Sequence, residues 1–135
     1  MSTTRPVALE RVRVHDAMHR GIISIDPETP LRTVARTMAR RRVHAVAVVI
    51  AGDGERPVRI VSALDVVAAA ASGSNEAAGD VASTEALTVS SRERLDHAAQ
   101  MMADHELSHL IVTDSASGQP IGVLSTLDIA AVYGA

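Results

Sequence analysis

The sequence of 135 residues contains no cysteine, tryptophan or phenylalanine, and Tyr133 is its one aromatic residue. Without cysteine, disulfide bonds and thiolate ligands are excluded, and this composition is typical of proteins of the reducing cytoplasm. Without an aromatic stacking platform, the base of a ligand would have to rest on aliphatic side chains. Hydrophobic residues still make up 47% of the chain. The sequence therefore predicts a real core built from Val, Ile, Leu, Ala and Met.

A strong positive charge is also missing. The formal net charge is −3, and Arg40–Arg42 is the only basic run, whereas nucleic-acid binding needs a broad basic surface. We interpret this run as the solvated end of a helix, where cations favour the helix dipole. No apolar run approaches the ~20 residues that span a bilayer, and residues 1–10 lack an apolar signal core. We expect a cytoplasmic protein that binds neither nucleic acid nor membrane.

What the sequence does contain is an internal repeat. Residues 60–68 read Ile-Val-Ser-Ala-Leu-Asp-Val-Val-Ala, and residues 123–131 read Val-Leu-Ser-Thr-Leu-Asp-Ile-Ala-Ala. Further aligned pairs are Asp16 with Asp80, Ile23 with Leu87, Leu31 with Leu95, Ala35 with Ala99, Met38 with Met102 and Val48 with Val112. One copy of about 60 residues buries too little surface to be stable alone. We therefore expect the two copies to pack against each other through their strands.

Both copies predict the same order of elements: helix, short strand, helix, strand, strand, helix. The long helices follow from apolar residues at i, i+3, i+4 and i+7, beginning at Leu31 and at Leu95. The other predicted elements are small helices at 11–18 and 76–82, short strands at 22–25 and 86–89, long strands at 45–50, 58–61, 110–113 and 121–124, and closing helices at 63–71 and 126–132. Turns are expected at 52–54 and 114–118. The prediction is a mixed α/β fold of two repeats with pseudo-two-fold symmetry.

The duplicated order resembles a tandem pair of cystathionine-β-synthase (CBS) domains, a Bateman module. Val14–Met18 looks like the opening helix of this family and Ile22–Ile25 like its first strand. Pro57–Asp65 and Pro120–Asp128 look like its closing strand, with the signature Gly-hydrophobic-hydrophobic-Ser/Thr-x-x-Asp. The resemblance divides the chain into a tail (1–11), repeat 1 (12–71), a linker (72–75) and repeat 2 (76–133).

The resemblance implies a stand-alone regulatory module that has no catalytic residues and requires no cofactor. Such pairs bind AMP, ADP, ATP or S-adenosylmethionine in two clefts between the repeats, and they commonly form homodimers. We expect the homodimer contact on the small-residue helix faces at 66–71 and 129–132. The protein regulated by the module, and the preferred ligand, are left open by the sequence.

Two departures from the family pattern make the clefts unequal. Arg59 occupies the signature position that Gly122 holds in repeat 2, and Ala82 occupies the position of Met18. The sequence leaves open whether Arg59 blocks or assists the first cleft, and whether one or both clefts bind. Because repeat 2 keeps the full signature, we expect the ligand in the cleft of Ser125.

The Ser-x-x-Asp motifs at Ser62–Asp65 and Ser125–Asp128 are the main candidate binding residues. A strand that delivers a hydroxyl to a helix N-terminus suits a phosphate, and an acidic side chain nearby can accept hydrogen bonds from a ribose diol. The alternative is a helix capping box, in which serine and aspartate satisfy each other's backbone groups. The two roles can coexist.

The resemblance implies further contacts. Ser24 would line the cleft beside Asp128, and Thr88 the cleft beside Asp65, with Ile23 and Leu87 as aliphatic walls for the base. His44 and His109 stand at the entries of two long strands, where family members often present basic residues to phosphates. The alternatives are half-exposed strand hydroxyls, core residues and ordinary surface histidines.

His105-Glu106-Leu107-Ser108-His109 matches the zinc-protease pattern His-Glu-x-x-His. That chemistry needs both histidines on one helix face, whereas the repeat alignment ends the helix near His105 and starts a strand at His109. A metal-binding protein is therefore the remote alternative. The nearer alternative is a structural or interaction module whose clefts bind no nucleotide.

Overall fold

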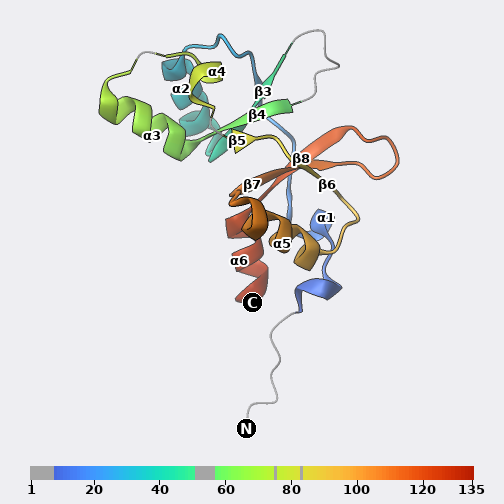
Figure 1. The fold of residues 1–135 in the computed structure, drawn as a ribbon. Coiled ribbons are helices and arrows are strands. Elements are labelled where there is room, and N and C mark those ends of the chain that lie inside the picture. Colours follow the sequence, from blue (N-terminus) through green and yellow to red (C-terminus); the bar gives the residue numbers. More distant parts are fainter. Residues whose placement is uncertain (1–7, 51–56, 75, 83) are drawn as a thin grey trace. The chain divides into compact units, whose positions relative to one another are not determined.

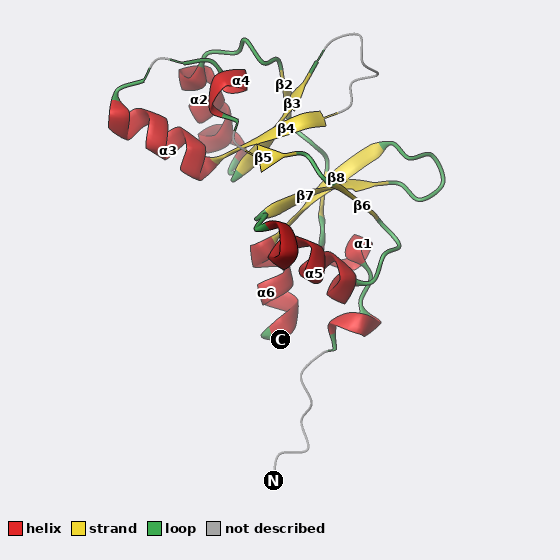
Figure 2. Cartoon of the chain, in the orientation of Figure 1, coloured by secondary structure: helices red, strands yellow, loops and turns green. Residues whose placement is uncertain are grey.

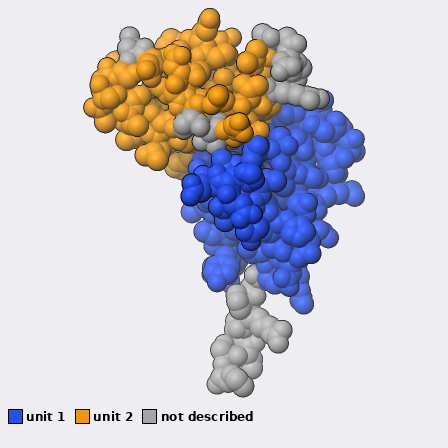
Figure 3. Space-filling model, in the orientation of Figure 1, with its two compact units in different colours: residues 1–21, 87–135 blue, residues 22–86 orange. Residues whose placement is uncertain are grey.

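The computed structural model describes residues 8–50, 57–74, 76–82 and 84–135. The chain folds into a series of helices and short strands (Figure 1) that form two compact units (Figure 3). Unit 1 consists of Met1–Gly21 and Leu87–Ala135, and unit 2 consists of Ile22–Ala86. Each unit has one four-stranded sheet, and its helices lie on one side of that sheet (Figure 2). The predicted mixed α/β fold class is confirmed.

Unit 2 contains most of repeat 1. Its sheet has the order β2-β3-β4-β5, with β2 and β3 parallel and the other neighbours antiparallel. Alternate strand residues, among them Val46, Val48 and Val61, point into a core shared with the helices. The elements are β2 (Ser24–Ile25), α2 (Leu31–Arg41), β3 (Ala45–Val49), β4 (Pro57–Ser62), α3 (Ala63–Ser72), α4 (Ala78–Val81) and β5 (Thr84–Glu85).

Unit 1 contains most of repeat 2. Its sheet has the order β1-β8-β7-β6, with β6 and β7 parallel and the other neighbours antiparallel. Leu95, Leu110 and Leu124 are fully buried in its core. The elements are a 3-10 helix (Leu9–Arg11), α1 (Val14–Ala17), β1 (His19–Arg20), β6 (Thr88–Ser90), α5 (Leu95–His105), β7 (His109–Thr113), β8 (Pro120–Ser125) and α6 (Thr126–Tyr133).

The two units exchange their opening helices. α1 belongs to repeat 1 by sequence, yet Val14 is fully buried in the core of unit 1, and its N–H donates to the Glu93 carbonyl. α4 belongs to repeat 2, yet Ala78 is fully buried in the core of unit 2, and its N–H donates to the Thr29 carbonyl. Each compact unit therefore contains residues from both repeats.

The apolar periodicity placed the long helices correctly, since α2 buries Leu31, Val34 and Met38. α5 buries the aligned face of Leu95, Ala98 and Met102. The first strands were predicted too long, because β2 retains only Ser24–Ile25 of 22–25 and β6 covers Thr88–Ser90 rather than 86–89. Ile23 packs on the core just before β2. Its side chain is therefore apolar because it is partly buried, although the residue lies outside the strand.

The short strands β1 and β5 have two residues each and were not predicted from periodicity. The small helices α1 and α4 are four residues long, shorter than expected. The predicted turn at 52–54 lies outside the described residues. In the part of the chain that the structure describes, no helix is long and apolar enough to cross a membrane.

Gly122 sits at the tightest contact between β8 and β1. A β-carbon built there would clash with the backbone carbonyl oxygen of His19. We predict that Gly122→Ala lowers the free energy of unfolding by about 1–3 kcal/mol, because backbone atoms cannot move aside as side chains do. Gly134→Ala is the control, since its nearest neighbour would be the Ala130 oxygen at 3.3 Å and surface changes cost about 0.5 kcal/mol or less. Urea unfolding of both variants tests this, and equal losses would contradict it.

Candidate functional site

Both Ser-x-x-Asp motifs form capping boxes where a strand runs directly into a helix. At the start of α6, the Asp128 N–H donates to Ser125 Oγ (3.2 Å), and the Ser125 N–H donates to Asp128 Oδ2 (2.8 Å). At the start of α3, the Asp65 N–H donates to Ser62 Oγ (3.2 Å), and the Ser62 N–H donates to Asp65 Oδ2 (2.9 Å). The capping role is thus present in both repeats.

Asp128 makes a second contact through its other oxygen. His19 Nε2 lies 2.7 Å from Asp128 Oδ1, and the His19 side chain is 78% exposed whereas that of Asp128 is only 8% exposed. The buried carboxylate therefore presents Oδ1 to a donor that reaches it from the surface. A donor on a ligand, such as a ribose hydroxyl, could take this place.

His19 was not identified as a site residue from the sequence. The contact arises because β1 pairs with β8, which places His19 opposite Val123. A two-residue strand has no periodicity, and its partner lies at the other end of the sequence. No local signal in the sequence could have identified this histidine.

The other predicted residues fall into two groups, one in each unit. Unit 1 contains Ser125, Asp128, His109, Leu87 and Thr88, and unit 2 contains Ser62, Asp65, His44, Ile23 and Ser24. Ser24 and Thr88 are exposed on β2 and β6, where Ser24 lies opposite Ala47 and Thr88 opposite Ile111. The pairings of Ser24 with Asp128 and of Thr88 with Asp65 join different units, and they stay predictions.

The two histidines at the strand entries do not occupy equivalent positions. His109 lies in β7 opposite Ser125, and its Nδ1 is 3.2 Å from Ser108 Oγ. His44 precedes β3, and its carbonyl accepts the N–H of Ala63, the first residue of α3. In unit 1 it is the Ser108 carbonyl that accepts the N–H of the first residue of α6. His109 therefore stands beside the signature serine, whereas His44 is the counterpart of Ser108.

Arg59 points to the helix side of its sheet. Its Nη1 donates to the Ala82 carbonyl at 3.2 Å, just after α4 ends. Arg59 alternates with Val61, which faces the core. The guanidinium is thus engaged with the exchanged opening helix.

The His-Glu-x-x-His segment is not helical throughout. α5 ends at His105, Glu106 takes a left-handed conformation (φ 54°), and His109 belongs to β7. The two imidazoles therefore do not share a helix face, which the zinc-protease arrangement requires. Across the described residues, no three His, Asp or Glu side chains cluster as metal ligands.

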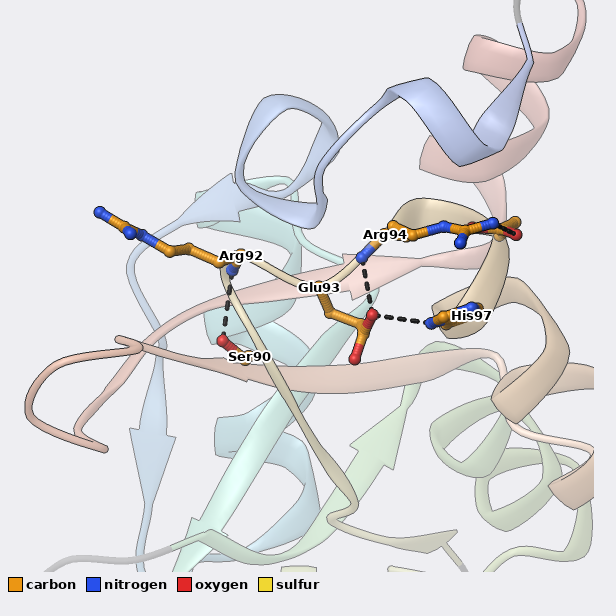
Figure 4. Close-up of polar contacts among 6 residues, drawn as sticks. Ser90, Arg92, Glu93, Arg94 and His97 are labelled. Carbon is orange, nitrogen blue, oxygen red and sulfur yellow. Dashed lines mark hydrogen bonds and ion pairs between the residues drawn. The ribbon is translucent and has the colours of Figure 1, made fainter.

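An ion-pair cluster surrounds the start of α5 (Figure 4). Glu93 Oε1 accepts the Arg94 N–H (2.9 Å) and lies 2.8 Å from His97 Nδ1. The hydrogen bond from the Arg94 backbone, and after it the contact with His97, hold the pKa of Glu93 below its ordinary value. Two hydrogen bonds from Arg94 lower the pKa of Asp96, and the same contact raises the pKa of Arg94.

The lowered carboxylate pKa values fix the sign of their effect on stability. These contacts stabilise the folded protein fully at pH values above the ordinary carboxylate pKa. This stabilisation is lost as the pH falls through the lowered pKa values of the two carboxylates. The groups lie at the surface, where ion pairs contribute little. We interpret the cluster as support for the start of α5 and not as a binding site.

A protein-family profile and several solved structures match this chain. The CBS domain profile matches residues 14–72 and 78–134. The chain is 26% identical to a CBS domain protein from Pyrobaculum aerophilum complexed with AMP, with a TM-score of 0.76, 92% of this chain and 100% of that chain covered. It is 19% identical to the CBS domain pair of protein MJ0100 in complex with 5′-methylthioadenosine and S-adenosyl-L-methionine, with a TM-score of 0.78, 91% of this chain and 96% of that chain covered.

A third similar structure is CBSX2 in complex with AMP, at 22% identity and a TM-score of 0.69, with 88% of this chain and 93% of that chain covered. Among curated proteins, no match is found. The profile match covers most of the chain and falls on both repeats. The protein therefore belongs to the CBS domain family and carries two CBS domains in tandem.

Proposed function

We propose that this protein is a regulatory module that binds an adenosine-containing ligand, without catalysis of its own. The observation that carries the proposal is the buried Asp128 carboxylate, which uses Oδ2 to cap α6 and presents Oδ1 to an exposed donor. A ribose diol needs such an acceptor. Similar CBS structures hold AMP or S-adenosylmethionine, which supports the ligand class.

In this proposal each side chain has a defined role. Asp128 accepts from the ribose, and Ser125 holds the carboxylate in place while the start of α6 favours phosphate. His109, opposite Ser125 in the sheet, supplies a ring nitrogen to the phosphate. Ser24 and Ile23 complete the contacts around the nucleoside.

In the same proposal, Thr88, Leu87 and His44 are the equivalent set for the Ser62–Asp65 site. We propose that it binds the same ligand more weakly, because Asp65 is only partly buried and repeat 1 lacks the signature glycine. A carboxylate in a wetter environment gains less from a new hydrogen bond.

A structural or interaction module is the second candidate. It is favoured by the capping boxes, because the Ser-x-x-Asp motifs have a complete structural role without any ligand. The two candidates differ in one property, which is whether the folded protein binds nucleotides.

We also propose that the module is a homodimer. α3 presents Leu64 (74% exposed) and Val67 (60% exposed). Beside them lies a shallow groove of about 360 Å³ between α2 and α3, lined mainly by apolar side chains such as Met38 and Val66. An apolar ridge next to an apolar groove suits a two-fold contact, in which each copy fills the groove of the other.

The first prediction compares the two signature carboxylates. In calorimetric titrations with AMP, ATP and S-adenosylmethionine, Asp128→Ala should weaken binding at least about tenfold, since bonds to a charged group contribute about 1.5–3 kcal/mol. Asp65→Ala is the matched control, because it removes an equivalent cap. Equal losses would contradict the proposed inequality, and no binding to the wild type would favour the structural module.

The second prediction concerns His19, which occupies the oxygen that the ribose needs. We expect His19→Ala to strengthen binding of adenosine about threefold, because the ribose then no longer competes with the imidazole for Asp128 Oδ1. His15→Ala, which removes the neighbouring contact with Asp16, should leave the affinity unchanged. Weaker adenosine binding by the His19 variant would show that the imidazole assists the ligand instead.

The third prediction tests the dimer. We expect light scattering of the wild type to give twice the mass of one chain, and Leu64→Glu to give a monomer, because the charge would be buried in the contact. Ala116→Glu, on the exposed turn between β7 and β8, is the control and should remain dimeric. A monomeric wild type at high micromolar concentration would refute this proposal.

A further inference from the structure

The two departures from the family pattern, Arg59 in repeat 1 and Ala82 in repeat 2, are in contact with each other in unit 2. Arg59 replaces the signature glycine and Ala82 replaces the methionine, and Arg59 Nη1 donates to the Ala82 carbonyl at 3.2 Å. In unit 1 the corresponding residues also meet, since a β-carbon at Gly122 would lie 3.3 Å from Met18 Sδ. Large and small residues have therefore exchanged places between the strand and the end of the opening helix.

The strand that follows the opening helix also pairs differently in the two units. In unit 1, Arg20 of β1 lies opposite Gly122. In unit 2, Glu85 of β5 lies opposite Arg59. The repeat alignment, however, makes Thr84 the counterpart of Arg20. β5 is therefore displaced by one residue relative to β1.

An inserted residue does not explain this displacement. The opening helices α1 and α4 cover aligned residues, and β2 and β6 pair with the next strand in aligned registers. The segment between them has the same length in both repeats. The register of β1 and β5 is thus chosen by local contacts.

The glycine position accounts for the choice. Gly122 allows the His19 carbonyl to approach so closely that any β-carbon would clash with it. Arg59 carries a β-carbon, so the segment after α4 cannot pair with β4 in the same way. Displacement by one residue relieves this clash, and it also places the acidic Glu85 opposite the basic Arg59.

The register determines which residue of the segment takes the strand position that His19 holds in unit 1. In unit 1, His19 lies opposite Val123, and its imidazole reaches Asp128. In unit 2, the residue in that register position is Thr84, opposite Ile60.

We infer that Arg59 with Ala82, and Gly122 with Met18, are alternative residue pairs that set this register and so determine the ligand specificity of each site. The ligand part of this inference rests on the proposed function. On this inference, Arg59 with Ala82 makes the Ser62–Asp65 site bind AMP more weakly than the Ser125–Asp128 site.

The register is tested directly by nuclear Overhauser contacts across β4 and β5. In the wild type, Glu85 should contact residue 59. In the double variant Arg59→Gly, Ala82→Met, Thr84 should take its place. Arg59→Ala is the matched control, because it removes the guanidinium but keeps the β-carbon, and it should retain the wild-type register. An unchanged register in the folded double variant would overturn the inference.

Thermal unfolding tests the pairing without any ligand. Each single change, Arg59→Gly or Ala82→Met, should lower the Tm by about 3 °C or more, whereas the double variant should recover part of that loss because the new side chain fills the vacated space. Additive losses would overturn the pairing.

AMP titration tests the ligand part in the Asp128→Ala background. We expect that adding Arg59→Gly and Ala82→Met restores AMP binding at least about tenfold, and that Asp65→Ala then removes it. A changed register without restored binding would overturn the ligand part. If the wild type binds no AMP, the proposed function fails, whereas the register contacts and the Tm values still decide the pairing.

Discussion

The junction between a buried strand and the helix that follows it is the constraint on which each unit depends. β4 and β8 run into α3 and α6 without a loop, and a Ser–Asp capping box closes each junction. A cap of this kind contributes about 1 kcal/mol and fixes the direction in which the helix leaves the strand. The helix can then cover the core face of the sheet, and the aspartate is held in the first turn of the helix.

The same carboxylate serves the fold with one oxygen and remains available with the other. Asp128 Oδ2 accepts the Ser125 N–H, while Oδ1 meets the exposed imidazole of His19. Structural and binding roles therefore do not compete for the same lone pairs. They remain coupled, because removal of the carboxylate removes the cap together with the contact. This coupling is why a comparison of Asp128 with the equally capped Asp65 is more informative than either change alone.

The exchange of opening helices links the two repeats at the level of their cores. Val14 and Ala78 are each fully buried in the unit built mainly from the other repeat. The units nevertheless differ where the exchanged helix ends. A glycine on β8 admits the close approach of the His19 carbonyl, whereas the corresponding position on β4 is Arg59, opposite Glu85. In the mechanism that we infer, the β-carbon of Arg59 excludes this approach and displaces β5 by one residue, since backbone atoms cannot move aside as a side chain can.

The sequence by itself determined the repeat, because residues 60–68 and 123–131 can be compared directly. It also determined the amphipathic faces that begin at Leu31 and Leu95 and the Ser-x-x-Asp caps, because each of these depends on residues within two helical turns of one another. The tertiary structure alone decided the short strands β1 and β5, the contact of His19 with Asp128, and the role of Arg59 on the Ala82 carbonyl. These features depend on residues that are distant in sequence and meet only after the opening helices have been exchanged. A two-residue strand carries no periodicity of its own, so its partner and register are set by the space that neighbouring side chains leave.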